Sequence, residues 1–460
     1  MEMLIKARKM SIRCLCRLVL QALPKIFAFS PSLLKTFQRD EHVHPPLIEA
    51  AIVGSELPVE IIMDIFSLLE IPDLVRAGSV CSSWHAAYTS VRSLGMYRSP
   101  RTPCLLYTSE SDADNVVCLY SLAEKRVYKL TLPEPPIRNR YLIGSTYGWL
   151  VTAAEMSELD MVNPITGEQF SLPSVTTIEQ VKPIYDDNGA IQKYEFSECY
   201  GAEEVSTPSV YDLDKLRDYL YVKAFVFFES SSGSCIVVLI HNPSNQLSFA
   251  KTGDRSWTWL PPSAFYRDCD YMDGLLYAVT DMGGIDVFDL TGPTVSRKVI
   301  IDRSKGFPYE QLYLLLLPCG DLLQVWREQD VAVRAAEDEG APEHDPPEFF
   351  METRKIMMYK VDMNEKELVE VYGLQDYALF LGLSSSFLQI ADGNPQLENR
   401  VYLTDDDQGF TLRKSYRRDV CVFNLENNKI EEIVSPRLWS SWPAPIWIKP
   451  SLSKVSSGNK

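Results

Sequence analysis

The spacing of apolar residues changes once along the chain, from helical periodicity to strict alternation. Between positions 57 and 88, apolar residues recur three and four positions apart, which predicts two short helices. Pro58 suits the first turn of one helix, and Pro72 with Asp73 begins the other. The residues on these helices are Ile61, Ile62, Ile65, Phe66, Leu68, Leu69, Val80, Cys81 and Trp84. A unit below ~40 residues rarely folds without a disulfide, a metal or a partner. We therefore expect something else to cover part of this apolar surface.

From about Pro103 onward, apolar and polar residues alternate. Six segments share one pattern, in which an alternating run, a polar turn and a second alternating run predict a β-hairpin. They are Val117–Leu130, Leu159–Leu172, Leu247–Leu260, Ile285–Ile300, Ile356–Val371 and Val420–Ile433. Seven further strand-like runs lie between them, for example "VKAFVFF" and "NRVYLTD". Two strands and a hairpin per ~40 residues is the unit of a β-propeller blade, and radial repetition protects strand edges. The pattern predicts an all-β propeller of six or seven blades.

Several segments interrupt this organisation. Glu328 to Glu348 contains "AAEDEGAPEHDPPE", an acidic insertion that we expect to be a solvated loop. Residues 1–40 carry eight basic residues against Glu2 and Asp40, a net charge of +6. This basic start is typical either of an organelle transit segment or of a disordered tail, such as one added by a start upstream of Met10. We divide the chain into a basic segment and connector (1–54), a helical module (55–95), a propeller (100–451) and a tail (452–460).

The charge and the cysteine content indicate which cellular compartment and which classes of partner suit the chain. The net charge of the chain is −17, so residues 41–460 carry −23 and repel phosphate backbones, which argues against nucleic acid as a partner. No stretch approaches the ~18 uncharged apolar residues of a membrane span. The ten cysteines form no CxxC pair, and most stand singly in apolar runs. This pattern favours buried thiols in a reducing compartment over disulfides or zinc, and we expect an intracellular protein of the cytoplasm or nucleus.

Candidate chemistry is sparse. The five histidines, His42, His44, His85, His241 and His344, show no catalytic spacing, and no phosphate-binding or dinucleotide motif is present. Asp405–Asp407 and "YDDNG" at Tyr185–Gly189 lack the full spacing of a calcium loop, and we interpret both as solvated turns. Trp257 and Trp259 indicate either blade packing or, as an alternative, a sugar platform. We expect no catalytic residue, no cofactor and no metal.

The helical segment resembles an F-box. The matching positions are Leu57, Pro58, Glu60, Ile61, Ile65, Leu69, Asp73, Leu74, Val80, Cys81 and Trp84. Three residues depart from the family pattern, in which basic residues are common at the positions of Ser82 and His85, and a better helix former is usual at Gly78. These departures could weaken affinity for the adaptor.

The rest of the chain resembles the C-terminal domain of plant F-box proteins with a kelch-like propeller, long catalogued as a domain of unknown function. The matching segments are Thr252–Leu260, Tyr266–Leu290, Asp376–Ala391, Asn399–Asp406 and Trp442–Ser451. The resemblance implies that the F-box binds a Skp-type adaptor, which bridges to a cullin–RING ubiquitin ligase, while the propeller binds a protein target. It places adaptor binding on Leu57, Pro58, Ile61, Ile62, Ile65, Leu69, Val80 and Trp84, some of which must instead hold the module together. It names no target-binding residue.

The resemblance leaves three functions to compare. The leading hypothesis is a non-catalytic substrate receptor of a Skp–cullin–F-box ubiquitin ligase. The second is an interaction protein outside the ligase. The third is a propeller enzyme or glycan-binding module with a helical appendage, which convergent carboxylates at the propeller centre would favour.

Overall fold

The computed structural model describes residues 57–97, 103–200, 203–204, 207–229, 234–292, 294–306, 310–317, 319–334, 348–434 and 438–452. The chain divides into two compact units, Met1–Ser99 and Pro100–Lys460. Residues 1–54, interpreted from the sequence either as an organelle transit segment or as a disordered tail, lie outside the described residues. So do His42, His44, His344 and nearly all of the tail. No helix in the described ranges has the length and apolar character needed to cross a membrane.

The helical module contains three helices where the sequence predicts two. They are α3 (Val59–Phe66), α4 (Ile71–Ala77) and α5 (Ser82–Ser93). The second predicted helix is divided because Gly78 ends α4 and Cys81 is extended before α5. The rings of Phe66 and Trp84 meet edge to face at 5.4 Å and join α3 to α5.

Gly78 has a packing reason for departing from the family pattern. A Cβ atom at this position would lie 2.6 Å from Cγ of Tyr88. The Tyr88 ring therefore packs directly on the backbone at the end of α4. The Gly78 carbonyl also lies 3.1 Å from Nδ1 of His85, within hydrogen-bond distance. The glycine thus allows α5 to approach the end of α4 closely.

The second unit consists mainly of strands, which form six sheets of four or five strands in the described ranges. The first sheet has the order β3 (Arg126–Thr131), β2 (Val116–Ser121), β1 (Cys104–Tyr107), β30 (Ile446–Ile448). The second has β4 (Tyr141–Thr146), β5 (Trp149–Ala153), β6 (Leu159–Val162), β7 (Gln169–Ser171). The third has β13 (Tyr221–Phe228), β14 (Cys235–His241), β15 (Gln246–Lys251), β16 (Thr258–Leu260).

The remaining three sheets follow in chain order. The fourth has β17 (Tyr266–Met272), β18 (Leu275–Thr280), β19 (Ile285–Asp289), β20 (Ser296–Ile301). The fifth has β21 (Gln311–Leu316), β22 (Leu322–Arg334), β23 (Glu348–Asp362), β24 (Glu367–Val371). The sixth has β26 (Phe387–Ile390), β25 (Tyr377–Leu381), β27 (Arg400–Leu403), β28 (Cys421–Asn424), β29 (Lys429–Glu431). Each of the six predicted hairpins is the outer strand pair of one sheet.

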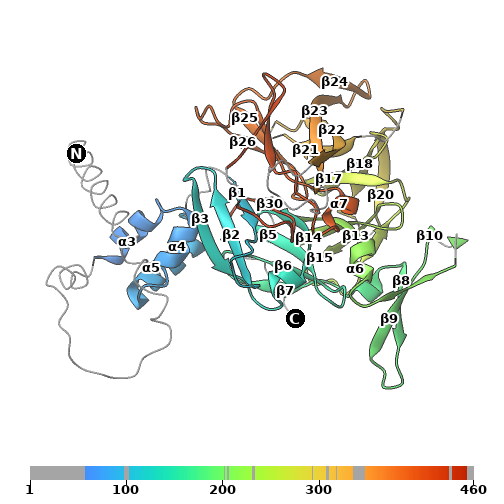
Figure 1. Cartoon of the computed structure of the whole chain (residues 1–460), viewed down its shortest axis with the longest axis horizontal. Helices are drawn as coiled ribbons and strands as arrows, with labels where there is room; N and C mark the ends of the chain where they lie inside the picture. Colours follow the sequence, from blue (N-terminus) through green and yellow to red (C-terminus); the bar gives the residue numbers. More distant parts are fainter. Residues whose placement is uncertain are drawn as a thin grey trace, which may run out of the picture. The chain divides into compact units, whose positions relative to one another are not determined.

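The sheets pack on one another in chain order (Figure 1). The second and third approach so closely that a Cβ on Gly144 would lie 2.0 Å from the carbonyl oxygen of Ala224, which only glycine permits. The third packs on the fourth, where the rings of Phe227 and Tyr271 stack at 5.5 Å. Shared apolar clusters likewise join the fourth sheet to the fifth and the fifth to the sixth.

The two ends of the β unit close the ring. β30, the last strand, pairs antiparallel with β1, the first, with Cys104 opposite Ile448. Trp447 of β30 meets Phe380 of β25 edge to face at 5.1 Å, so the sixth sheet packs on the first. The first contacts the second where Asn163 donates a hydrogen bond to the Ser451 carbonyl at 3.0 Å. This closed arrangement confirms the predicted propeller architecture.

Two features were not predicted. Between the second and third sheets lies an insertion with β8 (Val181–Tyr185), β9 (Ile191–Phe196), β10 (Cys199–Tyr200), β11 (Glu203–Glu204), β12 (Ser209–Asp212) and α6 (Leu216–Leu220). Its β8–β9 hairpin extends away from the six sheets (Figure 1). In addition, β22 and β23 run into the expected acidic loop and pair as far as Arg334 and Glu348, so part of 328–348 is strand. Residues 335–347 lie outside the described residues.

Candidate docking surfaces and the buried polar centre

Three of the eight expected adaptor-binding residues lie inside the helical module. The exposed fractions of Ile62, Ile65 and Leu69 are 4%, 5% and 3%. Phe66 and Leu74 are buried as well. These three side chains therefore belong to the core of the module, a distinction that helical periodicity alone does not make.

The other five expected residues reach the surface of the module. Pro58 and Val80 are exposed, whereas Leu57, Ile61 and Trp84 are half-buried. Two more apolar side chains that sequence reasoning left out of this set are also exposed, Val59 at 40% and Leu68 at 38%. The module thus has a buried core and, in addition, several exposed apolar side chains. Exposed apolar side chains grouped in this way are typical of a docking surface.

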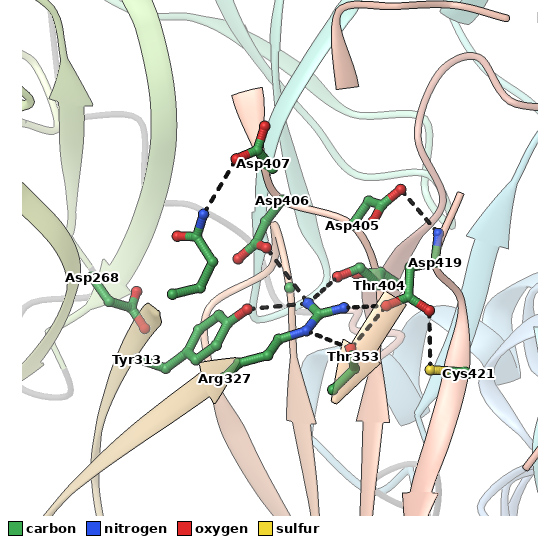
Figure 2. A network of polar contacts seen from close by, with 12 residues as sticks. Asp268, Tyr313, Arg327, Thr353, Thr404, Asp405, Asp406, Asp407, Asp419 and Cys421 are labelled. Atoms are coloured by element: carbon green, nitrogen blue, oxygen red, sulfur yellow. Dashed lines mark hydrogen bonds and ion pairs between the residues drawn. The ribbon is translucent and has the colours of Figure 1, made fainter. Parts of the chain in front are cut away.

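In the β unit, Arg327 is the centre of a buried polar network (Figure 2). Its side chain is fully buried. It donates hydrogen bonds to Thr353 Oγ1, to the Thr404 carbonyl and to Asp419 Oδ2, each at 2.9 Å. Its Nη1 atom also lies 3.6 Å from Asp406 Oδ1. One guanidinium from β22 thus holds groups that follow it in the chain by 26 to 92 residues.

The carboxylates around Arg327 are themselves engaged. Asp419 Oδ2 also accepts from Thr353 Oγ1 at 2.8 Å, and Asp419 Oδ1 accepts from Cys421 Sγ at 3.2 Å. The amide of Asp419 donates to Asp405 Oδ2 at 2.9 Å. Burial raises the pKa of Asp405 to about 7, and the charge of Asp419 acts in the same direction. The prediction that Asp405–Asp407 form a solvated turn is therefore wrong for Asp405, which is 1% exposed, and for Asp406, whose side chain is 8% exposed beside Arg327, whereas Asp407 is half-buried.

A second buried pair joins the third and fourth sheets. Lys223 Nζ lies 3.2 Å from Asp268 Oδ1 and donates to the Gly382 carbonyl at 2.8 Å. Asp268 Oδ2 accepts from the Leu314 amide and from Ser386 Oγ, both at 3.0 Å. Burial raises the pKa of Asp268 above its ordinary value, and Lys223 acts in the opposite direction.

Two segments of the sixth sheet occupy the space between the innermost strands of the other sheets. In the segment 382–386, the Ser385 amide donates to the Ser145 carbonyl at 2.9 Å, and its hydroxyl is hydrogen-bonded to Thr146. In the other segment, α7 (Gln408–Thr411) places Gln408 Nε2 3.0 Å from the Tyr221 carbonyl. The carboxylates do converge, as an enzyme would require, but they are packed among strands and paired with buried cations.

The other candidate chemical groups are also enclosed. His241 and Ser248 are buried and lie 2.8 Å apart from Nε2 to Oγ, and burial lowers the pKa of His241 to about 4. Trp257 is 6% exposed and donates to the Pro173 carbonyl at 2.9 Å, which is blade packing rather than a sugar platform. Within the described ranges, no three His, Cys, Asp or Glu side chains are grouped as a metal site would require.

One groove of about 420 Å³ opens on the β unit between β23 and the β28–β29 hairpin. Its lining includes Phe350 and Glu352 of β23, Ile430 of β29, and Trp439. Asp419, the partner of Arg327, also lines it. The groove therefore lies directly over the buried network, and sequence reasoning did not find it because its walls come from two different sheets.

Comparison with protein families matches both parts of the chain. The family model described as the KIB1-4 beta-propeller matches residues 119–424, and the F-box-like model matches residues 55–93. These ranges agree with the propeller and the helical module.

Individual relatives give the same result. The F-box protein SKIP23 of Arabidopsis thaliana is 26% identical over 417 residues, which cover 86% of this chain and 95% of that protein. A second F-box protein of the same plant is 26% identical over 419 residues, covering 86% of this chain and 96% of that one. Among solved structures, a candidate 6-phosphogluconolactonase of Bacteroides fragilis aligns at a TM-score of 0.33 and 11% identity, covering 76% of this chain and 98% of that one. That structural likeness is too remote to bear on function.

Proposed function

The chain belongs to the KIB1-4 β-propeller family of plant F-box proteins, and on this premise we propose that it is the substrate-recognition subunit of a Skp–cullin–F-box ubiquitin ligase. The F-box would bind the Skp-type adaptor, and the propeller would bind a protein target. Ubiquitin transfer would take place on other subunits, and this chain would supply proximity between the target and the ubiquitin donor. We expect the assembly in the cytoplasm or nucleus.

One observation carries the proposal: the F-box unit has its own core and still exposes apolar side chains. Ile62, Ile65 and Leu69 fill that core, whereas Pro58 and Val80 remain exposed. Stable interfaces have an apolar centre that the partner desolvates. We propose that Leu57, Pro58, Ile61, Val80 and Trp84 contact the adaptor, and that the three core residues support them.

The buried charges support a non-catalytic role. Arg327 lies against Asp419 and Asp406, and Lys223 against Asp268. The segment 382–386 contacts β4 through the Ser385 amide. A catalytic carboxylate must reach its substrate within hydrogen-bond distance. Paired and covered carboxylates are better suited to holding sheets together.

We also propose that the propeller has six blades. Six sheets of four or five strands pack in chain order, and each ends in one of the predicted hairpins. The insertion between the second and third sheets contains a three-stranded sheet of its own, and we assign it as a decoration rather than a seventh blade.

The test is direct binding of the purified full chain to a Skp-type adaptor, followed by measurement of target half-life in plant cells. A ligase subunit binds the adaptor and shortens the half-life of the protein it recruits. An interaction protein outside the ligase leaves the half-life unchanged when the chain is removed. Failure to bind any adaptor would overturn the proposal.

A further inference from the structure

The groove between β23 and the β28–β29 hairpin has both an apolar and an acidic character. Phe350 and Trp439 are half-buried in its wall, and the side chain of Ile430 is 41% exposed. Glu431 and Glu432 are exposed on the same border. The groove can therefore bind an apolar side chain of a partner. The acidic border favours a basic or neutral residue next to that side chain and disfavours an acidic one.

The arginines in the groove are engaged by the protein itself. The guanidinium of Arg417 lies 5.0 Å above the ring of Phe350, a cation–π contact. Arg418 is buried and donates to the Ser441 carbonyl at 2.6 Å and to the Thr411 carbonyl at 3.0 Å. Both cations are thus directed onto the wall or into the interior.

Two of the carboxylates are engaged as well, because Glu431 is paired with Arg400 and Glu352 with Arg354. Glu432, which is exposed, is therefore the carboxylate of this border that an incoming segment meets. The net charge of −17 acts in the same direction over a longer range.

The backbone at one side of the groove favours an extended partner. Five consecutive residues, 430–434, line the groove, so this segment borders it along its length and not with alternate residues only. β29 is the outermost strand of the sixth sheet, and residues 432–434 belong to neither strand nor helix. Among the described strands, β29 pairs with β28 alone, and an unpaired strand edge next to side-chain pockets is the arrangement by which proteins bind extended peptides.

The floor of the groove is rigidly supported from below. Asp419 and Cys421 form part of the floor, and Asp419 is bonded to Arg327 and Thr353. Because Thr353 lies in β23 and Asp419 just before β28, their hydrogen bond fixes the spacing of the two walls. The groove is therefore held open by buried contacts before any partner arrives, which lowers the ordering cost of binding.

We propose that this groove binds an extended peptide segment of a partner protein, in which Lys or Arg stands beside an apolar residue. The apolar side chain packs between Phe350 and Ile430, and the basic side chain faces Glu432. The inference rests on the proposed function in one respect only, since it makes the partner the target of the ligase.

The probe is a pair of short fluorescent peptide pools with one degenerate sequence. One pool fixes Lys or Arg beside Leu, Ile or Val, and the other replaces the basic residue by Glu. Fluorescence anisotropy with the purified full chain should give about tenfold tighter binding of the basic pool. Glu432→Lys should abolish this preference, and Phe350→Ala should weaken binding of the basic pool. Glu365→Lys, which makes the same charge change on the exposed β23–β24 turn, should leave both unchanged.

Three results would overturn the inference: equal binding of the two pools, an unchanged preference in Glu432→Lys, or a dimer of the chain that Ile430→Asp dissociates. The dimer would assign the groove to a second copy. Circular dichroism of each variant separates loss of binding from loss of fold. Because adaptor binding is measured on the other unit, a chain that binds the adaptor but neither pool would reject only this inference, whereas peptide binding without adaptor binding would reject the ligase role.

Discussion

Arg327 of β22 and Asp419, just before β28, are joined at 2.9 Å between Nη2 and Oδ2, and both side chains are buried. This ion pair connects the fifth and sixth sheets (Figure 2), and Asp419 also lines the groove. A buried charge whose partner is removed costs about 3–5 kcal/mol, whereas the intact pair contributes much less. The ion pair therefore fixes how the two sheets are joined and adds little to the free energy of unfolding.

Removing only the cation should be far more damaging than removing both charges. We expect Arg327→Met to lower the free energy of unfolding by about 3–5 kcal/mol, because Asp419 and Asp406 lose their buried counter-charge. The double variant Arg327→Met with Asp419→Asn should be more stable than the sum of the two single changes predicts. Urea unfolding monitored by tryptophan fluorescence measures both. Strict additivity would mean that the two side chains do not interact.

Asp270 should make stability depend on pH. Burial raises its pKa to about 7, so the folded state binds this proton more tightly than the unfolded chain does. Its contribution is fully present below about pH 4 and is lost as the pH rises through 7. Asp270→Asn cannot ionise, so its melting temperature relative to the unaltered chain should rise by about 2–4 °C between pH 5 and pH 8. The exposed Asp187→Asn is the control, and an equal change in both variants would contradict the assignment.

The adaptor surface can be tested with two half-buried residues at the start of the F-box. Leu57→Ala with Ile61→Ala should weaken adaptor binding roughly thousandfold, taking about 2 kcal/mol for each anchor lost. Strand content measured by circular dichroism should persist, because the β unit has its own core. Lys429→Ala in β29 should change nothing. Adaptor affinity like that of the unaltered chain would place the two side chains outside the interface.

Gly78 should be needed for the packing of α5 on α4. A methyl group at this position would meet the Tyr88 ring at 2.6 Å, so Gly78→Ala should destabilise the F-box by about 1–3 kcal/mol despite the better helix propensity of alanine. Faster hydrogen exchange in α4 and α5 of the full chain is the readout. Gly78→Ala combined with Tyr88→Ala should restore part of the protection. Unchanged exchange in the single variant would show that the ring moves away at little cost.

The acidic insertion should be dispensable for folding. β22 and β23 pair antiparallel up to Arg334 and Glu348, so an Asn-Gly turn can join them directly. Replacing residues 335–347 with Asn-Gly should leave the melting temperature within a few degrees of the full chain. A larger fall, measured by differential scanning fluorimetry, would show that the segment contributes to packing. Deletion of Asp186–Gly189, made in parallel, tests whether the insertion sheet tolerates a shorter β8–β9 turn.

The sequence determined the elements whose signals are local. Strict alternation around polar turns placed all six hairpins, because the side-chain period of a strand is two and each turn interrupts it visibly. The F-box positions were equally readable, since their spacing follows the helical repeat. The change from one period to the other also separated the module from the propeller. All of these predictions rest on local patterns and require no information about which segments contact one another in the fold.

Only the tertiary structure shows which of these residues are buried, which are exposed and which have a counter-charge. Ile62 and Val80 look alike in a helical pattern, yet Ile62 is buried on α3, whereas Val80 lies in the connection between α4 and α5 and is exposed. Asp405 and Asp406 look like part of a solvated turn, yet Asp405 is buried and the side chain of Asp406 lies beside Arg327 from another sheet. The groove likewise exists only where β23 and β29 come together. Long-range pairing sets the local dielectric and the counter-charge of each group, and a single sequence does not encode that pairing in any local pattern.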